Sequence, residues 1–345
     1  MAKSVVEEKL VENNEESSGV DKSHPLCSVK GVGPKTAEKL IEAGVSTPEQ
    51  LACLRPDELA DMLGITKKAA KDMTNYALSI ALDTAIVIKS MQDEIDHRRE
   101  VVKRIPTGSS KFDAAIKGGI PTEAITLFKG EAESGKSEFC HQLVVNTKKY
   151  YDRKAVWIST ENMTFSPDRI NDMAKAIGCK INPKEDILFI DSGQVNTPYS
   201  LFIAYQRVVK EIETKGLDVG IFVVDSFTSP FRRFYGDRSQ LPDRSREESR
   251  HLGYLDALAK KFNIAVVLTA QIMDIPDQGG QLGERAHSGH DKRMVGGNVL
   301  RHSATYGISL AQVASYQYEG VIFASPDVPK TAFRFSIKEG GIRDI

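Results

Sequence analysis

An eight-residue segment has the residue types and spacing that bind the phosphates of a nucleoside triphosphate. Residues 130–137 fit the pattern G-x-x-x-x-G-K-[S/T]. Its glycines let successive backbone N–H groups point at a β-phosphate, while Lys136 adds a positive charge and Ser137 a hydroxyl ligand for Mg²⁺. A glycine-rich turn with a stray lysine is the alternative. The residues predicted to bind ATP here are Gly130, Glu131, Ala132, Glu133, Ser134, Gly135, Lys136 and Ser137.

Two acids and one amide that follow apolar runs have side chains suited to ATP hydrolysis. An acid at the tip of a buried strand, such as Asp225, can hold magnesium directly or through water, or it can cap the next helix. Glu161 could orient the attacking water, and Gln271 could sense the γ-phosphate through its amide. Spacing alone leaves the roles of Glu161 and Gln271 open.

These side chains need a sheet whose strand ends meet at one edge. From Ile105 onward, short apolar runs alternate with helical patterns, which predicts βαβ units in a mostly parallel sheet and hence an α/β fold. The alternating runs are 124–128, 155–158, 187–190, 219–224 and 264–268. Three later runs without intervening helices predict antiparallel strands that extend one edge of the sheet, at 304–311, 320–324 and 332–337.

Length and composition describe an ordinary globular protein. The 345 residues are enough for two or three domains, and 41% are hydrophobic and 27% charged. A net charge of −1 makes any nucleic-acid surface a local patch. The four cysteines form no C-x-x-C pair, which favours reduced thiols in a cytoplasmic protein. No run approaches a membrane span and no signal peptide is evident, so no membrane partner is expected.

The composition changes along the chain and predicts four segments. Residues 1–23 contain five glutamates and little to bury, which is typical of a disordered acidic tail. Residues 24–82 predict a compact helical domain, and 83–104 a charged linker. Residues 105–345 carry the α/β pattern and the nucleotide-binding segment.

The helical domain contains a motif that binds DNA backbones. Residues 29–37 read Val-Lys-Gly-Val-Gly-Pro-Lys-Thr-Ala, which resembles a helix-hairpin-helix motif. The turn at Gly31 and Gly33 bares backbone N–H groups beside Lys35, which predicts contact with phosphates regardless of base sequence. A plain turn between helices with solvated lysines is the alternative. Residues 63–69 form a weaker second copy.

The motifs together form an ordered set that resembles a known family. After the helix-hairpin-helix unit come 107–109, 118–120, the phosphate-binding segment, 159–162, 223–226, Gln271 and 296–298. This order resembles the RadA/Rad recombinase branch of the RecA family, from about residue 25 to the C-terminus. The resemblance implies a RecA-like ATPase core with a small all-α domain. It also implies a DNA-dependent ATPase that assembles on single-stranded DNA and promotes pairing and strand exchange with double-stranded DNA.

The resemblance also implies roles for single residues. Lys136 and Ser137 match the phosphate and magnesium positions, and Asp225 the second magnesium position. Glu161 matches the glutamate that activates water, and Gln271 the residue that couples nucleotide state to DNA.

Three further residues match positions around the base and the neighbouring subunit. Arg169 matches the arginine that stacks on adenine. His302 lies where the family places a histidine near the neighbouring subunit's nucleotide, and Pro326 matches the proline of the cap over that nucleotide.

Two segments resemble the family's DNA loops. Six arginines lie between positions 232 and 250, interleaved with aromatic residues that can stack on bases, but four acids share the segment, so a solvated helix face is the alternative. The residues that match family positions are Arg232, Tyr235, Arg238 and Arg244. The polar, glycine-rich stretch 273–297 matches the second loop. Its two histidines, without further ligands, do not predict a metal site.

The chain departs from the family where subunits meet. No phenylalanine occurs in 83–104, where the family has a Phe-x-x-Ala docking segment, and the apolar residues 85–88 are a candidate replacement. The cap has Ala324 instead of an acid, and Glu133 puts a negative charge in the phosphate loop. The family's basic hairpin is replaced by Ala-Gln-Val-Ala-Ser at 311–315.

These differences leave three functions open. The leading hypothesis is a recombinase that forms a filament or ring of its own subunits in the cytoplasm, associated with the nucleoid, or in the nucleus of a eukaryote. The main alternative is a non-filamenting RadA paralogue that regulates a related recombinase. A RecA-fold helicase or kinase-like ATPase would leave the helix-hairpin-helix unit unexplained.

Overall fold

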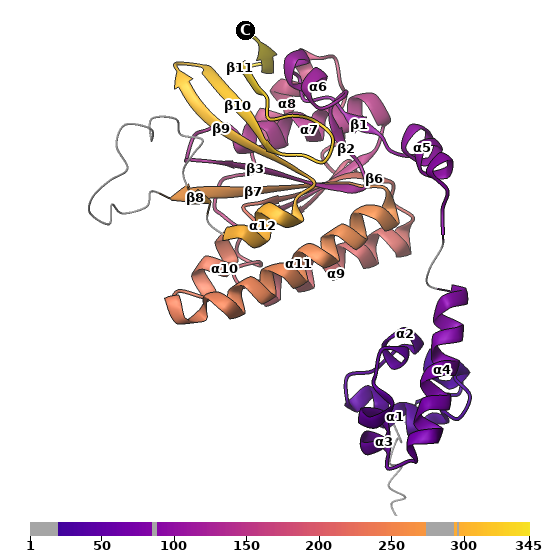
Figure 1. Cartoon of the computed structure of the whole chain (residues 1–345). Coiled ribbons are helices and arrows are strands. Elements are labelled where there is room, and N and C mark those ends of the chain that lie inside the picture. The colour runs from indigo at the N-terminus through magenta and orange to yellow at the C-terminus, as the bar shows by residue number, and fades with distance from the viewer. Residues whose placement is uncertain (1–19, 85–87, 274–292, 295–296) are drawn as a thin grey trace, which may run out of the picture. The chain divides into compact units, whose positions relative to one another are not determined.

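The computed structural model describes residues 20–84, 88–273, 293–294 and 297–345, and it divides the chain into two compact units (Figure 1). The units are Met1–Glu94 and Ile95–Ile345. Residues 85–87 of the predicted docking segment, most of the predicted tail and most of the second DNA loop lie outside the described residues.

The N-terminal unit is a small all-α bundle. Proline opens each of its first helices, where the missing N–H costs nothing, and Thr47 Oγ1 accepts a hydrogen bond from Gln50 N at 3.3 Å. Its own apolar core includes Leu26, Leu40 and Leu51. The elements are η1 (Pro25–Ser28), α1 (Pro34–Glu42), α2 (Pro48–Ala52), α3 (Pro56–Leu63) and α4 (Lys67–Thr84).

The second unit begins within α5 (Met91–Glu100), inside the segment expected to be a linker. His97 Nε2 lies 2.7 Å from the Glu123 carboxylate, and Asn263 Nδ2 donates to Val101 O at 2.9 Å. These two contacts hold the end of α5 and the residues after it against the rest of the unit.

A ten-stranded sheet forms the centre of the second unit, in the order β12-β11-β10-β9-β3-β7-β6-β4-β5, with β8 paired to β7. Its strands are β3 (Ala124–Gly130), β4 (Lys154–Ser159), β5 (Ile187–Ile190), β6 (Val219–Asp225), β7 (Ala265–Met273), β8 (Arg293–Met294), β9 (Tyr306–Ala314), β10 (Gln317–Ala324), β11 (Ala332–Lys338) and β12 (Gly341–Asp344). β1 (Arg104–Ile105) and β2 (Ile120–Pro121) pair separately.

The mostly parallel sheet predicted from the sequence is confirmed. β3, β4, β5, β6 and β7 pair in parallel, and each contains most of a predicted apolar run. β10, β11 and β12 extend the sheet by antiparallel pairing. The expectation that residues 304–311 form an antiparallel strand is wrong on one side, because β9 runs parallel to β3 and antiparallel to β10.

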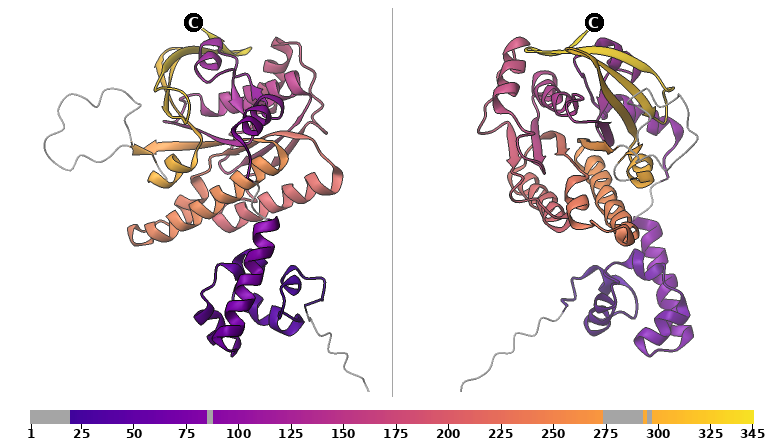
Figure 2. Two further views of the ribbon diagram at one scale, coloured as in Figure 1. Left: turned by 45° about the vertical axis from the view of Figure 1, so that its right-hand side comes forward. Right: turned by 90° about the vertical axis from the view of Figure 1, so that its left-hand side faces the viewer.

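Helices cover both faces of this sheet, as Figures 1 and 2 show. One apolar layer includes Phe139 and Met173 from α7 and α8, and the other includes Tyr205 and Leu255 from α9 and α11. The helices are α6 (Ser110–Ala115), α7 (Lys136–Tyr151), α8 (Pro167–Ala176), α9 (Pro198–Lys215), α10 (Ser229–Phe234), η2 (Arg238–Gln240), α11 (Leu241–Phe262) and α12 (Gly297–Ser303). None of the helices described is long and apolar enough to cross a membrane.

Candidate nucleotide-binding site

The phosphate-binding segment forms the turn between β3 and α7, so backbone N–H groups gather at the start of a sixteen-residue helix. Gly135 has φ +93°, and a Cβ added there would lie 2.7 Å from Ile337 Cδ1. A Cβ on Gly130 would overlap Ser134 Oγ. Both glycines are therefore required by backbone conformation or by close packing.

Lys136 is buried and turned into the loop. Its Nζ donates to Gly130 O at 3.0 Å, to Glu131 O, and to Ser134 Oγ at 3.3 Å. Burial lowers the pKa of this ammonium, while the nearby carboxylates of Asp225 and Glu161 act in the opposite direction. The lysine charge is thus held at the loop where phosphates would be bound.

Ser137 and Asp225 lie together below the loop. Ser137 Oγ donates to Asp225 Oδ2 at 2.7 Å, and Thr269 Oγ1 donates to the other carboxylate oxygen. Burial raises the pKa of Asp225, and these two hydrogen bonds oppose the rise. A hydroxyl and a buried carboxylate are oxygen ligands of the kind that Mg²⁺ prefers, so this pair fits the cation. Thr269 is a contact that sequence reasoning missed, although it lies two residues before Gln271 on β7.

Glu161 and Gln271 meet at the carboxyl ends of β4 and β7. Gln271 Nε2 lies 3.3 and 3.1 Å from the two Glu161 carboxylate oxygens, and Ser226 Oγ donates to the same group at 3.1 Å. Arg232 Nη1 donates to Gln271 Oε1 at 3.3 Å. The structure thus connects a predicted DNA-loop arginine to the predicted catalytic glutamate through one amide.

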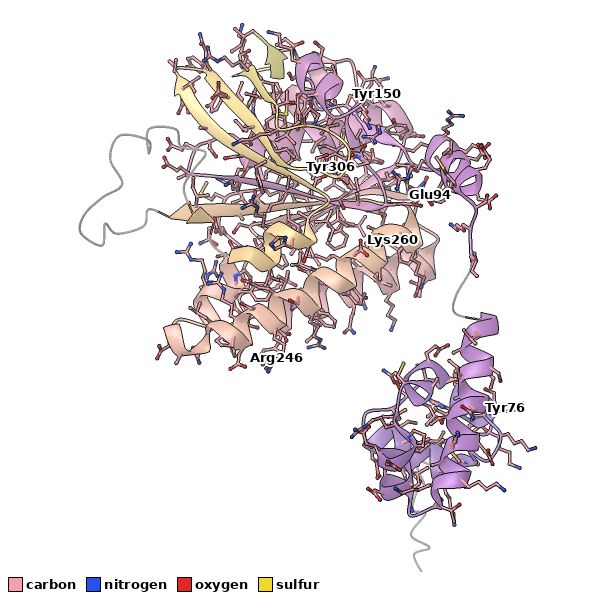
Figure 3. The ribbon with its side chains drawn as sticks, viewed as in Figure 1. Tyr76, Glu94, Tyr150, Arg246, Lys260 and Tyr306 are labelled. Atoms are coloured by element: carbon pink, nitrogen blue, oxygen red, sulfur yellow. The ribbon has the colours of Figure 1, made fainter. Side chains whose placement is uncertain are left out.

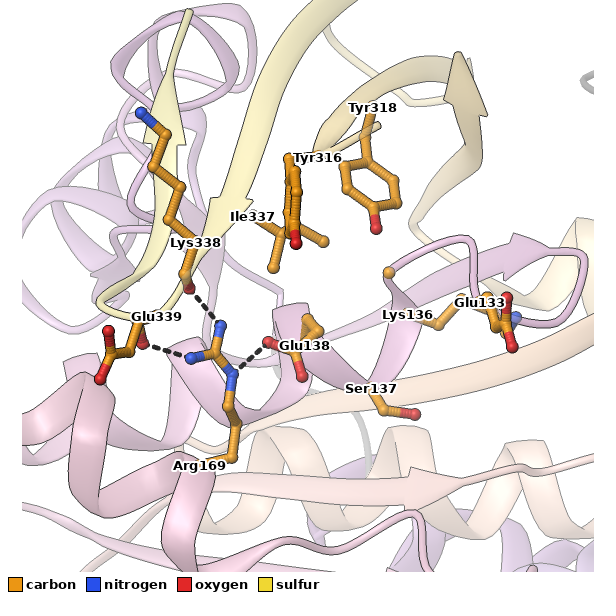
Figure 4. A pocket seen from close by; sticks show the side chains of 11 residues that line it. Glu133, Lys136, Ser137, Glu138, Arg169, Tyr316, Tyr318, Ile337, Lys338 and Glu339 are labelled. Carbon is orange, nitrogen blue, oxygen red and sulfur yellow. Dashed lines mark hydrogen bonds and ion pairs between the residues drawn. The ribbon is translucent and has the colours of Figure 1, made fainter. Parts of the chain in front are cut away.

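A cavity of about 470 Å³ opens beside the phosphate loop (Figure 4). Arg169, from α8, lines it and is fixed by three acceptors: Glu138 Oε2 at 2.7 Å and the carbonyls of Lys338 and Glu339. Tyr316 and Tyr318, from the hairpin formed by β9 and β10, also line the cavity. Sequence reasoning did not identify them.

The other residues predicted to lie in the first DNA loop are Tyr235, Arg238 and Arg244, and their surroundings differ from those of Arg232. Tyr235, half-buried, packs edge to face on Phe234 with ring centroids 5.0 Å apart. Arg244 Nε donates to the buried Glu248 at 2.8 Å and is only 12% exposed. The backbone of Arg238 begins η2. Residues 274–292 of the second loop, including both histidines, lie outside the described residues.

The residues assigned to a neighbouring subunit's nucleotide lie on the surface of the chain. His302 is exposed on α12, and Pro326 is exposed between β10 and β11. Asp327, next to this proline, pairs with Lys117 at 2.9 Å and accepts from Tyr306 Oη at 2.7 Å. Neither His302 nor Pro326 lines the cavity beside the phosphate loop.

The N-terminal unit contains two turns in which a glycine with positive φ precedes a helix. Gly31 has φ +94°, and Gly33 precedes α1 without a side-chain cap, beside the exposed Lys35. In the second copy, Gly64 has φ +67° and Thr66 Oγ1 accepts from Ala69 N at 3.2 Å. Both turns leave backbone N–H groups at the start of a helix.

The fold and the site define a RecA-like P-loop ATPase core joined to a small helix-hairpin-helix domain. Residues 97–345 match the Rad51 family, and residues 23–77 match the SAM-like helix-hairpin-helix tandem, so the chain belongs to the Rad51 family of RecA-type recombinases. It is 35% identical to the DNA repair and recombination protein RadA of Aeropyrum pernix over 92% of the chain and 96% of that protein. It is 32% identical to the protein of the same name from Methanococcus voltae, over 93% of the chain and 100% of that protein.

Proposed function

We propose that this protein is a DNA repair and recombination protein that binds single-stranded DNA in the presence of ATP and promotes homologous pairing and strand exchange. The observation that carries the proposal is the chain of contacts from Arg232 through Gln271 to Glu161, at the mouth of the phosphate loop. It joins a DNA-loop residue to a hydrolytic residue, as a DNA-dependent ATPase requires. The names of the two RadA relatives support the same function.

In the proposed hydrolysis of ATP, the side chains act by positioning the phosphates and the attacking water and by placing positive charge beside the phosphates. Lys136 and the N–H groups at the start of α7 bind the β- and γ-phosphates, and Ser137 with Asp225 would hold Mg²⁺, which supplies positive charge to those phosphates. Ser226 and Gln271 hold the Glu161 carboxylate in place. Because it is positioned in this way, Glu161 orients the attacking water and accepts its proton.

We propose a division of labour along the chain. Residues 24–82 contact DNA phosphates through Gly31, Gly33 and Lys35, while 105–345 bind ATP and single-stranded DNA. Residues 1–23 serve as a tail, and 83–104 as a linker that contributes to oligomerisation. As a protein acting on DNA, it is expected in the cytoplasm of a prokaryote or the nucleus of a eukaryote.

Assembly is the point on which the second candidate function depends. The absence of phenylalanine in 83–104 favours a paralogue that binds ATP and DNA but regulates another recombinase. Light scattering with ATP and single-stranded DNA discriminates the two: a recombinase forms large filaments or rings, and a regulator stays small.

A gel-shift assay tests the main proposal. The full chain is mixed with labelled single-stranded DNA, with and without a non-hydrolysable ATP analogue, beside Lys136→Ala. We expect the wild type to shift the labelled DNA only when the ATP analogue is present, and Lys136→Ala to give no such shift. A wild-type chain whose binding does not respond to the nucleotide would refute it.

A further inference from the structure

The turn between β9 and β10 presents two tyrosines to the nucleotide cavity. Tyr316 has φ +58° and is 68% exposed, and Tyr318 follows at the start of β10. Both rings point from the hairpin toward the phosphate loop, and Arg169 lines the same cavity from α8 (Figure 4). The cavity beside the phosphate loop therefore has two aromatic residues in its lining.

Tyr318 of β10 and Ile337 of β11 lie close to Gly135 of the phosphate loop. A Cβ built on Gly135 would lie 2.7 Å from Ile337 Cδ1 and 3.7 Å from Tyr318 Cδ1. The Tyr318 ring is in turn stacked on Phe335, with centroids 5.5 Å apart and an interplanar angle of 18°. Tyr318 is thus a fixed wall beside the loop, whereas Tyr316, in the turn before β10, is mostly exposed.

The chemistry of this wall suits a neutral aromatic base. Burial raises the pKa of Tyr318, and the carboxylates of Glu138 and Glu133 raise it further, so its phenol stays protonated and able to donate. The Arg169 guanidinium is held in place by Glu138 and two backbone carbonyls. A planar base between a fixed guanidinium and an aromatic ring gains stacking energy on both faces.

We propose that Tyr316 stacks on the base of the bound nucleotide, with Tyr318 as the supporting wall, so that one subunit holds both the phosphates and the base. This proposal rests on the proposed function, because it takes the cavity beside the phosphate loop to be the ATP site. It adds a base-contacting residue at a hairpin that differs in sequence from the basic hairpin of related proteins.

Calorimetric titration of the full chain with Mg²⁺ and either ADP or inorganic tripolyphosphate tests this role. Tyr316→Asn removes the ring and keeps a residue type that tolerates positive φ. It is expected to weaken ADP binding by about 10-fold, as loss of one base stack does, and to leave tripolyphosphate binding unchanged. Tyr316→Phe should restore the affinity for ADP. Tyr150→Ala, exposed near the C-terminal end of α7, is the matched control and should bind both ligands like the wild type (Figure 3).

Two other results would have different meanings. If Tyr316→Asn binds ADP as tightly as the wild type while both bind tripolyphosphate, the proposed base contact is refuted and the ATP site stands. If the wild type binds neither ligand, the nucleotide site itself is wrong, and the base contact falls with it.

Discussion

The side-chain amide of Gln271 lies 3.1 and 3.3 Å from the two carboxylate oxygens of Glu161, although 110 positions separate them in the chain. Gln271 is on β7, and Glu161 follows the end of β4. The same amide accepts from Arg232 at 3.3 Å. A phosphate that drew Arg232 away would free the amide oxygen and so alter how the glutamate is held.

Gln271→Ala is expected to remove the stimulation of ATP hydrolysis by single-stranded DNA while leaving slow basal hydrolysis. The alanine cannot transmit the position of Arg232, yet Ser226 still holds Glu161. Steady-state phosphate release with and without DNA measures this, and Gln206→Ala, exposed on α9, is the control. Normal stimulation of the Gln271 variant would show that coupling takes another route.

Arg244→Ala is expected to act on stability more than on DNA affinity. Removing this arginine leaves the carboxylate of Glu248, only 1% exposed, without its 2.8 Å partner. Breaking such a buried pair costs about 3 kcal/mol of unfolding free energy. Denaturant unfolding measures it, and Arg246→Ala, at an 81% exposed side chain on the same helix, should change it by less than about 1 kcal/mol. Unchanged stability with weaker DNA binding would instead make Arg244 a direct DNA contact.

Stability is expected to fall as the pH drops from about 6.5 toward 3, in part because of His251. Burial among aromatic rings, with a smaller effect of the nearby Arg250 charge, lowers the pKa of this histidine to about 3. Between the two pKa values the unfolded chain binds a proton that the folded chain does not, so acid favours unfolding. Glu247, 3.6 Å away, is the one opposing charge among the described contacts.

The contribution of His251 can be separated from those of the carboxylates. At about 1.4 kcal/mol per pKa unit, the loss of unfolding free energy reaches about 5 kcal/mol at low pH. Melting temperatures of the wild type and His251→Leu, compared between pH 7 and 4, should show a smaller fall in the variant. Parallel curves for the two proteins would mean that the pKa of His251 is the same in the folded and unfolded chains.

Much of the fold was predictable from the sequence because a parallel strand buried on both faces appears as a short apolar run. The phosphate loop was equally clear, since Gly135 is required by its backbone and by Ile337. Local patterns could not show long-range pairings. β9 runs parallel to β3 and antiparallel to β10, and no local pattern in its sequence distinguishes these two neighbours.

In the candidate site, too, local sequence patterns could not show contacts between distant parts of the chain. Asp225 could be predicted because it ends an apolar run, but its second hydrogen-bond donor, Thr269, comes from a different strand. Tyr316 and Tyr318 belong to the β9–β10 hairpin, which the order of strands in the sheet brings near the phosphate loop. The spacing of residues in a motif therefore identifies those near one strand end. It does not identify residues that the folded sheet brings to the same place from distant parts of the chain.

The rate of ATP hydrolysis with and without single-stranded DNA, measured beside Glu161→Gln, tests whether Glu161 drives a hydrolysis that responds to DNA. We expect stimulation by DNA in the wild type and a loss of about 100-fold or more in the variant, which keeps ATP binding because Lys136 and Ser137 are intact. Turnover in Glu161→Gln equal to that of the wild type, or no response of the wild type to DNA, would contradict it.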